Sequence, residues 1–439
     1  MGNRVRLRHK IHELRNSPLT GKSIGVLFLR VLGVLLFFSL TLFLTNNFDP
    51  VEVGKYDFSR SLLIFLGTLA VFGMQQSIIY YSGFLMAKEQ LGAIKSVYFR
   101  MVSVVLGISI LLVLGTLLLK TSLIEKWLGY PIPGMVLKTV WAIFFYGVTM
   151  LNIDAFRAIH KIYLSEVFRN IFRYLFFFIA VIVLFYGENS TWLVEAYLLN
   201  FAFLAIISTL VLWRQFGKAS LQWQEGFLRI SHKEILKRSA PMAVSAASFL
   251  LMQSLDVLML TSFTDYETVA FYSAAVKLTL LISIVLSSVN AVIAPQIAKD
   301  FASSKLEALK KNIKRSTRLI MLMTLPLILI LALFSSFVLH FFGASYVSAN
   351  TALLILLMGQ AVNAFCGSIG VYLNMTGKQQ VFQVVLLSAL GVNVVLNYFL
   401  IPKFGMTGAA IATSVSMILW NAAAVLYVYQ KDGVKTFLS

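Results

Sequence analysis

Charged side chains occur inside the long apolar stretches of this sequence, where a charge is unfavourable unless it has a specific role. Three are clearly internal, namely Arg30, Asp256 and Lys277, and Arg60 lies just inside another stretch. An Arg, Lys or Asp near the centre of a membrane-spanning helix costs about 2.5–3.5 kcal/mol on insertion scales. Each of the four residues is therefore a candidate functional residue, and Arg30 is expected to face protein or water rather than lipid.

Asp256 and Lys277 are predicted to form an ion pair across two neighbouring helices. Their depths are about 9 and 12 Å from the same membrane surface at 1.5 Å per residue. The connection at 263–268 is short, so the two helices are adjacent and antiparallel. Two interpretations remain. The pair either makes two buried charges tolerable, or Asp256 releases Lys277 on binding a proton or a cation and so couples an ion gradient to substrate.

The composition excludes a soluble protein and favours an all-α integral membrane protein. Hydrophobic residues make up 59% of the 439 residues and charged residues 13%. A helix needs roughly 20 apolar residues to cross the bilayer core. About twelve runs meet this requirement; they lie at 22–44, 59–83, 97–119, 135–153, 170–187, 191–213, 240–262, 269–294, 317–342, 351–373, 380–401 and 407–429.

The formal net charge of +19 is explained by membrane topology rather than by nucleic-acid binding. Most Lys and Arg residues fall in the two tails and in every second loop, whereas acidic residues divide almost evenly between the two sides. This is the asymmetry that the positive-inside rule describes. Both termini are therefore expected in the cytoplasm, and the first apolar run is too long for a signal-peptide core.

The predicted spans divide into two sets of six, joined by a long cytoplasmic connection. The expected organisation is a basic N-terminus (1–21), an N-lobe (22–213), a link (214–238), a C-lobe (239–429) and a cytoplasmic C-terminus (430–439). Because six is even, both halves enter the membrane in the same direction, as in transporters built from parallel repeats. A substrate cavity between the two bundles is the expected consequence.

Catalytic and metal-binding motifs are absent from the sequence. There is no His-Glu-x-x-His, no phosphate-binding Gly-x-x-x-x-Gly-Lys and no Gly-x-Ser-x-Gly, and the one cysteine, Cys366, lies in an apolar run. No cofactor and no metal site are predicted, and the protein is not expected to be an enzyme. A membrane-bound transferase or polymerase is the enzymatic alternative, although its chemistry is missing.

Two segments near the C-terminus carry a resemblance to a known superfamily. They are Leu-Asn-Met-Thr-Gly-Lys at 373–378 and Asn-Val-Val-Leu-Asn-Tyr-Phe-Leu-Ile-Pro-Lys-Phe-Gly-Met-Thr-Gly-Ala-Ala-Ile-Ala-Thr at 393–413. Thr-Gly-Lys makes a tight turn, and Ile-Pro-x-x-Gly a short turn before a helix of small residues. The pattern resembles the O-antigen type of polysaccharide flippase in the multidrug/oligosaccharidyl-lipid/polysaccharide (MOP) exporter superfamily.

This resemblance implies a MATE-like fold whose two six-helix lobes enclose a cavity lined by spans 1, 2, 7 and 8. Arg30, Arg60, Asp256 and Lys277 fall one on each of these spans. The resemblance implies an anionic substrate, an oligosaccharide on a polyprenyl diphosphate. Arg30, Arg60 and Lys277 would hold the diphosphate, and Asp256 would couple transport to an ion.

The implied process is alternating access in the bacterial inner membrane, serving surface polysaccharide synthesis. Membrane lipid and other polysaccharide-assembly membrane proteins are the implied partners. Two alternatives remain open: a cation-coupled small-molecule or multidrug exporter of the same fold, and a membrane scaffold of a polysaccharide assembly complex that transports nothing.

Overall fold

The computed structural model describes residues 18–118, 132–217 and 230–437, and every regular element within them is helical. Most of the predicted N-terminal tail (1–21) and the middle of the predicted link (214–238) lie outside the described residues. The α-helices are α2 (Pro18–Asn47), α3 (Pro50–Val71), α4 (Met74–Ala87), α5 (Ile94–Leu118), α7 (Ile132–Val140), α8 (Ile143–Ala158), α9 (Ile162–Glu166), α10 (Arg173–Tyr186), α11 (Leu193–Phe216), α12 (His232–Phe263), α13 (Tyr266–Ala302), α14 (Leu306–Leu333), α15 (Ser335–His340), α16 (Asn350–Cys366), α17 (Ile369–Met375) and α18 (Gln379–Asp432). Short 3₁₀ or π segments are η1 (Leu91–Ala93), η2 (Val167–Phe172), η3 (Ser190–Trp192) and η5 (Ala344–Ala349).

The chain forms two compact units that interleave along the sequence. As far as the structure describes them, the first contains Met1–Leu44, Leu66–Thr116 and Thr139–Ala243. The second contains Thr45–Phe65, Leu117–Lys138 and Val244–Ser439. The second unit thus includes the end of α2 and most of α3. The lobe boundaries at 22–213 and 239–429 remain a prediction.

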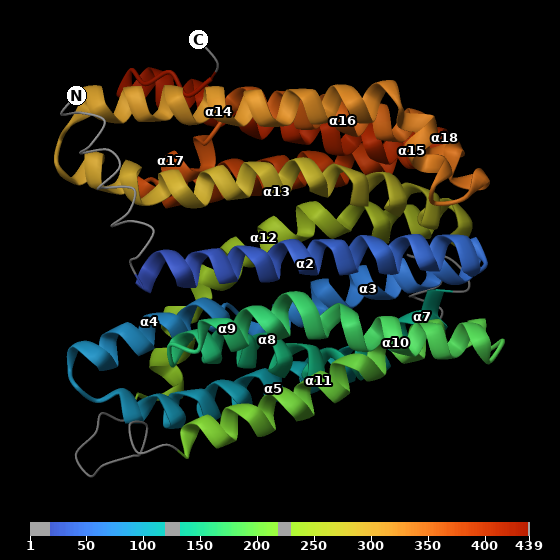
Figure 1. Ribbon diagram of the computed structural model, residues 1–439, viewed down its shortest axis with the longest axis horizontal. Helices are drawn as coiled ribbons and strands as arrows, with labels where there is room; N and C mark the ends of the chain where they lie inside the picture. Colours follow the sequence, from blue (N-terminus) through green and yellow to red (C-terminus); the bar gives the residue numbers. More distant parts are fainter. Residues whose placement is uncertain (1–17, 119–131, 218–229, 438–439) are drawn as a thin grey trace. The chain divides into compact units, whose positions relative to one another are not determined.

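In the first unit α8 is the central helix and packs against α4, α9 and α11 (Figure 1). Every residue from Tyr146 to Phe156 is buried. A helix that is buried on all sides must be apolar around its circumference or must pair its polar groups internally. The polar side chain of Asn152 is paired internally: its amide donates to the Ser208 and Thr209 hydroxyls at 2.8 and 2.9 Å.

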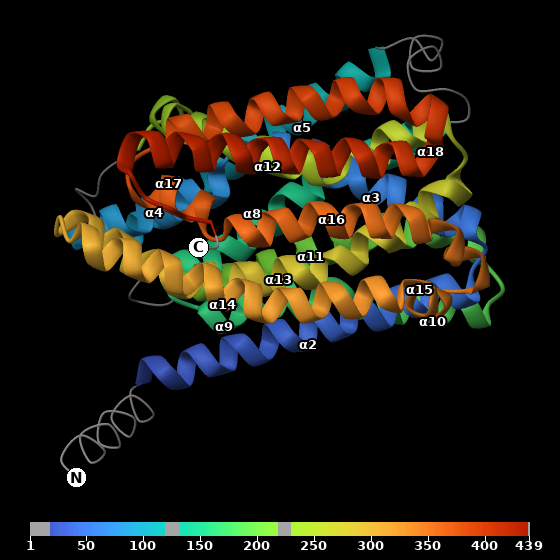
Figure 2. The same ribbon diagram turned by 90° about the horizontal axis from the view of Figure 1, so that it is seen from above.

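In the second unit α13, α14 and α16 lie side by side, as both ribbon views show (Figures 1 and 2). The helix α18 packs along α16 and α17. One apolar core joins these helices and includes Ile297, Ile313, Tyr372 and Val428.

Nine helices in the described parts of the chain are long and apolar enough to cross a membrane. A tenth is obtained if Gly134–Val140 and Ile143–Ala158, which meet at a bend of 42°, are one span. The predicted all-α membrane class is thereby confirmed. The exact count of twelve remains a prediction; the described residues of α12 include one shorter apolar stretch, Ser254–Phe263.

The 54-residue α18 is two helices joined by a sharp turn. A straight helix of that length would measure about 81 Å, far more than the roughly 30 Å of a bilayer core. Gly405 has φ 52° and ψ −132°, outside the helical region, and Pro402 lies just before it. Asn397 and Thr413, on either side of this turn, both donate to the Asp256 carboxylate, so the chain reverses direction between them. This is the turn that the Ile-Pro-x-x-Gly sequence predicts.

Candidate functional site

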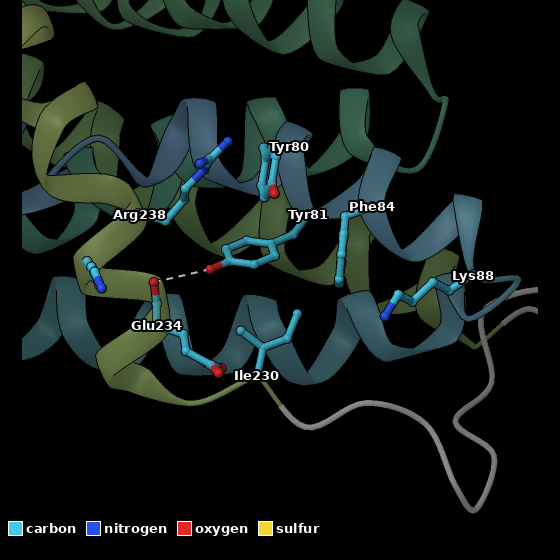
Figure 3. A pocket seen from close by; sticks show the side chains of 8 residues that line it. Tyr80, Tyr81, Phe84, Lys88, Ile230, Glu234 and Arg238 are labelled. Carbon is cyan, nitrogen blue, oxygen red and sulfur yellow. Dashed lines mark hydrogen bonds between the residues drawn. The ribbon is translucent and has the colours of Figure 1, made fainter.

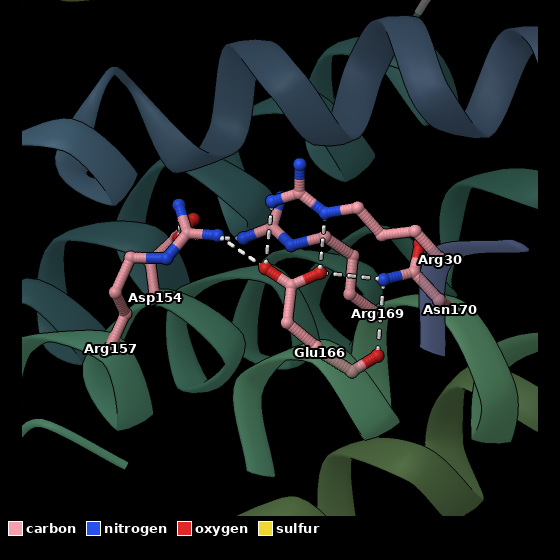
Figure 4. A network of polar contacts seen from close by, with 6 residues as sticks. All are labelled: Arg30, Asp154, Arg157, Glu166, Arg169 and Asn170. Atoms are coloured by element: carbon pink, nitrogen blue, oxygen red, sulfur yellow. Dashed lines mark hydrogen bonds and ion pairs between the residues drawn. The ribbon is translucent and has the colours of Figure 1, made fainter. Parts of the chain in front are cut away.

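Arg30 is held by a buried carboxylate in the first unit. Its Nε and one Nη each donate to a different oxygen of Glu166 at 3.0 Å, which is a bidentate pair. The Glu166 side chain is 1% exposed, whereas that of Arg30 is 52% exposed. The third guanidinium nitrogen points away from Glu166 (Figure 4). Glu166 thus holds one edge of the Arg30 guanidinium, and the nitrogen on the other edge faces away from this carboxylate.

A close approach of two backbones brings Arg30 to Glu166. A Cβ on Gly33, one turn after Arg30, would lie 2.5 Å from the Asn170 carbonyl oxygen, so α2 can contact this segment only because residue 33 is glycine. Glu166 is followed directly by the π-helical segment η2, and such segments often occur at functional sites. The Asn170 amide donates to Glu166 Oε2 at 2.8 Å and fixes the carboxylate from the other side.

Two further arginines and one aspartate extend this network (Figure 4). Arg157 donates to Glu166 Oε1 at 3.0 Å and lies 3.7 Å from Asp154, while Arg169 donates to Asp154 at 2.6 Å. Three guanidinium groups therefore share two carboxylates, which leaves an excess of one positive charge. Such a network can hold a guanidinium group in place for an anionic ligand.

Lys277 and Arg60 meet at Asp57 in the second unit. The Lys277 ammonium lies 2.9 Å from Asp57 Oδ2 and 2.8 Å from Oδ1, and the two side chains are 3% and 0% exposed. Arg60 Nε lies 3.4 Å from Asp57 Oδ1, and its side chain is 21% exposed. One carboxylate thus serves two cations.

The N-terminal part of α3 reaches this position because it touches the start of α13. A Cβ on Gly54 would lie 1.7 Å from the Tyr266 carbonyl oxygen, a distance that no side chain can occupy. Asp57 follows Gly54 by one helical turn and therefore projects beside α13, from which Lys277 comes. Phe58 packs edge-on against the Tyr266 ring, with the centroids 6.1 Å apart, and reinforces the contact.

Asp256 occupies a separate, polar site in the second unit. Its carboxylate accepts hydrogen bonds from the Asn397 amide at 2.8 Å, the Asn393 amide at 3.3 Å, the Tyr272 hydroxyl at 3.1 Å and the Thr413 hydroxyl. Asp256, Asn393 and Asn397 are buried, and Asn397 Oδ1 has no hydrogen-bond partner among the described residues. A buried carboxylate with amide and hydroxyl oxygens around it is an arrangement that could bind a proton or a hard cation.

The predicted ion pair between Asp256 and Lys277 is wrong. Lys277 pairs with Asp57, which lies 220 residues away in the sequence, and Asp256 accepts hydrogen bonds from neutral groups instead. Adjacent antiparallel helices bring two residues to similar depth but do not determine the direction in which each side chain points. The structure unites Arg60 and Lys277, gives Asp256 its own network, and places Arg30 in the first unit.

Asp57 and Glu166 are the important residues that sequence reasoning missed, because both were assigned to loops. The span starting at 59 excluded Asp57, yet α3 begins at Pro50. Proline at the first helical position and the acidic Glu52 in the first turn were available signals for this start. For Glu166 the signal is the spacing of three residues to Arg169, which places opposite charges on one helix face.

Comparisons with known proteins identify the family. The family model described as "Polysaccharide biosynthesis protein" matches residues 20–301, which is more than half of the chain. The chain belongs to this family. A second model, MatE, matches residues 241–399, so the predicted resemblance to the MOP superfamily is confirmed.

Relatives of this family member occur in Shigella flexneri and in Haloferax volcanii. The "Putative O-antigen transporter" of Shigella flexneri is 29% identical over 194 residues, which are 43% of this chain and 45% of that protein. The chain thus matches less than half of that relative's length. The "Probable flippase AglR" of Haloferax volcanii is 24% identical over 422 residues, which are 88% of this chain and 78% of that protein.

Solved structures show the same fold at low sequence identity. "Lipid II flippase MurJ, inward closed conformation" has a TM-score of 0.70 and 16% identity, with 92% of this chain and 87% of that chain covered. The inward-facing conformation of a multidrug resistance MATE family transporter has a TM-score of 0.70 and 13% identity, with 93% and 97% covered. This family member is therefore a multi-pass membrane protein with the MATE-like fold of MOP transporters.

Proposed function

We propose that this protein moves a polyprenyl-diphosphate-linked oligosaccharide across the cytoplasmic membrane by alternating access, for cell-surface polysaccharide biosynthesis. The observation that carries the proposal is the geometry of Arg30, a half-exposed guanidinium in an apolar helix that a buried carboxylate holds by one edge. Such a group can offer its remaining N–H donors to an anion without reorganising. Membership of the polysaccharide biosynthesis family makes a lipid-linked diphosphate the fitting anion.

In this proposal Arg30 of the first unit, and Arg60 and Lys277 of the second unit, are each candidate diphosphate-binding residues, with different tasks. Arg30 and Arg60 are partly exposed and provide the hydrogen-bond donors. Lys277 is buried against Asp57, so it contributes positive charge over a short distance rather than a direct contact. The Arg30 network has three guanidinium groups to two carboxylates, which favours an anionic headgroup and disfavours a cationic one.

We further propose that Asp256 couples transport to an ion. Its carboxylate and the Asn397 Oδ1 oxygen would bind a cation, or the carboxylate would bind a proton. Either event removes the negative charge that now orders Asn393, Asn397 and Thr413. These side chains come from both arms of α18, so neutralisation would alter the packing of α12 against that helix pair.

A cation-coupled exporter of small molecules is the second candidate, and the MatE match over 241–399 favours it. The positive excess around Arg30 argues against cationic drugs as substrates. The basic tails and loops support an inner-membrane location with both termini in the cytoplasm.

The test is complementation of surface polysaccharide in a flippase-null cell by Arg30→Ala, Lys277→Ala and Asp256→Asn. The matched control is Arg214→Ala, which removes an exposed arginine at the end of α11. Membrane levels of each variant are measured beside export.

We expect the three variants to insert normally, deliver much less polysaccharide to the surface and accumulate lipid-linked precursor inside, while the control exports normally. Full complementation by all three variants would mean that these three charges are structural. That outcome would also favour a scaffold that transports nothing.

A further inference from the structure

A pocket of about 450 Å³ opens in the first unit between the end of α4 and the start of α12 (Figure 3). Its lining combines aromatic and charged side chains, namely Tyr80, Tyr81, Phe84, Lys88, Ile230, Glu234, Lys237 and Arg238. Arg30 and Glu166 are not part of it. Pockets of this size accommodate a small ligand or a lipid headgroup with its first carbons.

The pocket is anchored by close packing below it. A Cβ on Gly73 would lie 2.5 Å from the Ala243 backbone nitrogen, so α4 and α12 touch through their backbones. The buried Ser239 hydroxyl donates to the Ser77 hydroxyl at 2.8 Å. Further along, the Tyr81 hydroxyl donates to the Glu234 carbonyl oxygen at 3.2 Å (Figure 3). These successive contacts show that the two helices are antiparallel here.

The pocket carries an excess of positive charge. Lys88, Lys237 and Arg238 are exposed and form no ion pair with a carboxylate among the described residues. Glu234, the one acidic residue of the lining, is engaged elsewhere: its carboxylate accepts from the Ser231 backbone N–H at 2.8 Å, and its own N–H donates to the Ser231 hydroxyl at 3.2 Å. This reciprocal pair is a capping box that closes the start of α12. The three cations are therefore available to an anion.

Aromatic rings hold two of the cations at the pocket. The Arg238 guanidinium carbon lies 3.8 Å from the Tyr80 ring centroid, and Lys88 Nζ lies 4.8 Å from that of Phe84. The Tyr80 and Phe84 rings are nearly parallel, at an interplanar angle of 14°. Cation–π contacts position the charges without neutralising them.

The pocket lies where helices α4 and α12 change from apolar to charged. Helix α4 contains no charged residue, and Lys88 is the first one after it. In α12 the charges fall in the first two turns and do not recur before Asp256. Since the helices are antiparallel, their charged ends coincide, as expected at a membrane–water boundary with aromatic residues. Ile79 and Met86, seven residues apart, are exposed apolar side chains on one face of α4.

We propose that this pocket binds the phosphate group of an anionic membrane lipid. Lys88, Lys237 and Arg238 contact the phosphate, and the lipid chain runs along the exposed apolar side of α4. The phosphate belongs either to a bilayer phospholipid or to a polyprenyl phosphate carrier. The site is separate from the residues assigned to transport and does not depend on the proposed function.

The experiment measures lipid retention by the purified full chain with native mass spectrometry. The probes are phosphatidylglycerol, decaprenyl phosphate, the zwitterionic lipid phosphatidylcholine and inorganic phosphate. The variants are Arg238→Gln, Lys237→Gln and the double variant. Lys233→Gln is the matched control, because Lys233 is an exposed lysine in the first turn of α12 that does not line the pocket.

We expect an anionic lipid to bind more tightly than phosphatidylcholine, with a loss of about fivefold in affinity for each cation removed. The lipid that binds more tightly, phosphatidylglycerol or decaprenyl phosphate, identifies the source of the phosphate. Lys233→Gln should bind as the wild type does. Equal binding by the wild type and the double variant would overturn the site, and displacement of lipid by equimolar inorganic phosphate would overturn its assignment to lipid. Retained helical circular dichroism in the double variant excludes misfolding as the cause of a loss.

Discussion

The buried pair of Asp57 and Lys277 provides the sharpest test of the second unit. Replacing Asp57 by Asn leaves the Lys277 ammonium, whose side chain is 3% exposed, without a negative partner. Breaking a buried pair in this way typically destabilises a protein by about 3–5 kcal/mol. Arg60 is 21% exposed and can turn toward water, so we expect it to add little to this loss. The predicted loss for Asp57→Asn is therefore about 3–5 kcal/mol.

The double variant Asp57→Asn/Lys277→Met separates an unpaired charge from a loss of packing. It contains no buried charge at this position, and replacing a whole buried pair by neutral groups is often without net cost. We expect it to recover most of the stability, so that the pair shows a coupling energy of about 3 kcal/mol. Lys277→Met alone should cost less than Asp57→Asn, since Asp57 keeps Arg60 as its partner.

The assay is equilibrium unfolding of the purified variants in mixed micelles of dodecyl maltoside and SDS, followed by circular dichroism. The control is Lys310→Gln, which breaks a pair with Glu307 whose side chains are 43% and 89% exposed. We expect almost no change there, because exposed pairs are solvated and contribute little. If Asp57→Asn is as stable as this control, the pair is not buried in the folded protein and the assignment of Lys277 to Asp57 fails.

Four further variants, with Gly83→Ala as a control, test the other positions. Gly54→Ala should abolish folded protein in the membrane, because its Cβ would lie 1.7 Å from a backbone oxygen of α13. Gly83→Ala should accumulate normally, because a Cβ there meets nothing within 4 Å. Immunoblots of membranes compare the two variants, and equal levels would argue against the close contact at Gly54. Glu166→Gln should lower polysaccharide export by at least about tenfold, because it releases Arg30 from its ion pair. Arg30→Lys should not support export in a flippase-null cell, because an ammonium cannot make the bidentate contact. Normal export by either variant would contradict the positioning of Arg30 by Glu166. Asp256→Asn should keep the protein folded but make residual export insensitive to ionophores, and an unchanged ionophore response would exclude coupling through this residue.

Much of the fold could be predicted because a bilayer restricts what an apolar chain can do. Backbone groups in lipid must be hydrogen-bonded internally, so long apolar runs become helices. The break near Gly405 was readable from Ile-Pro-x-x-Gly, since proline and glycine interrupt helices by known steric rules. Hydropathy does not mark the start of α3, because the helix begins at Pro50 in a segment that contains Glu52, Lys55 and Asp57.

The sequence by itself identified Arg30, Asp256 and Lys277 as residues needing an explanation, because the cost of a charge in an apolar helix depends only on that residue and its helix. Their partners were decided by tertiary structure alone. Glu166 is 136 residues from Arg30, and Asp57 is 220 residues from Lys277. Side-chain direction depends on helix rotation and on close approaches such as that at Gly54, which hydropathy does not encode. Whether a buried charge pairs with a carboxylate or joins a polar network is therefore a property of packing.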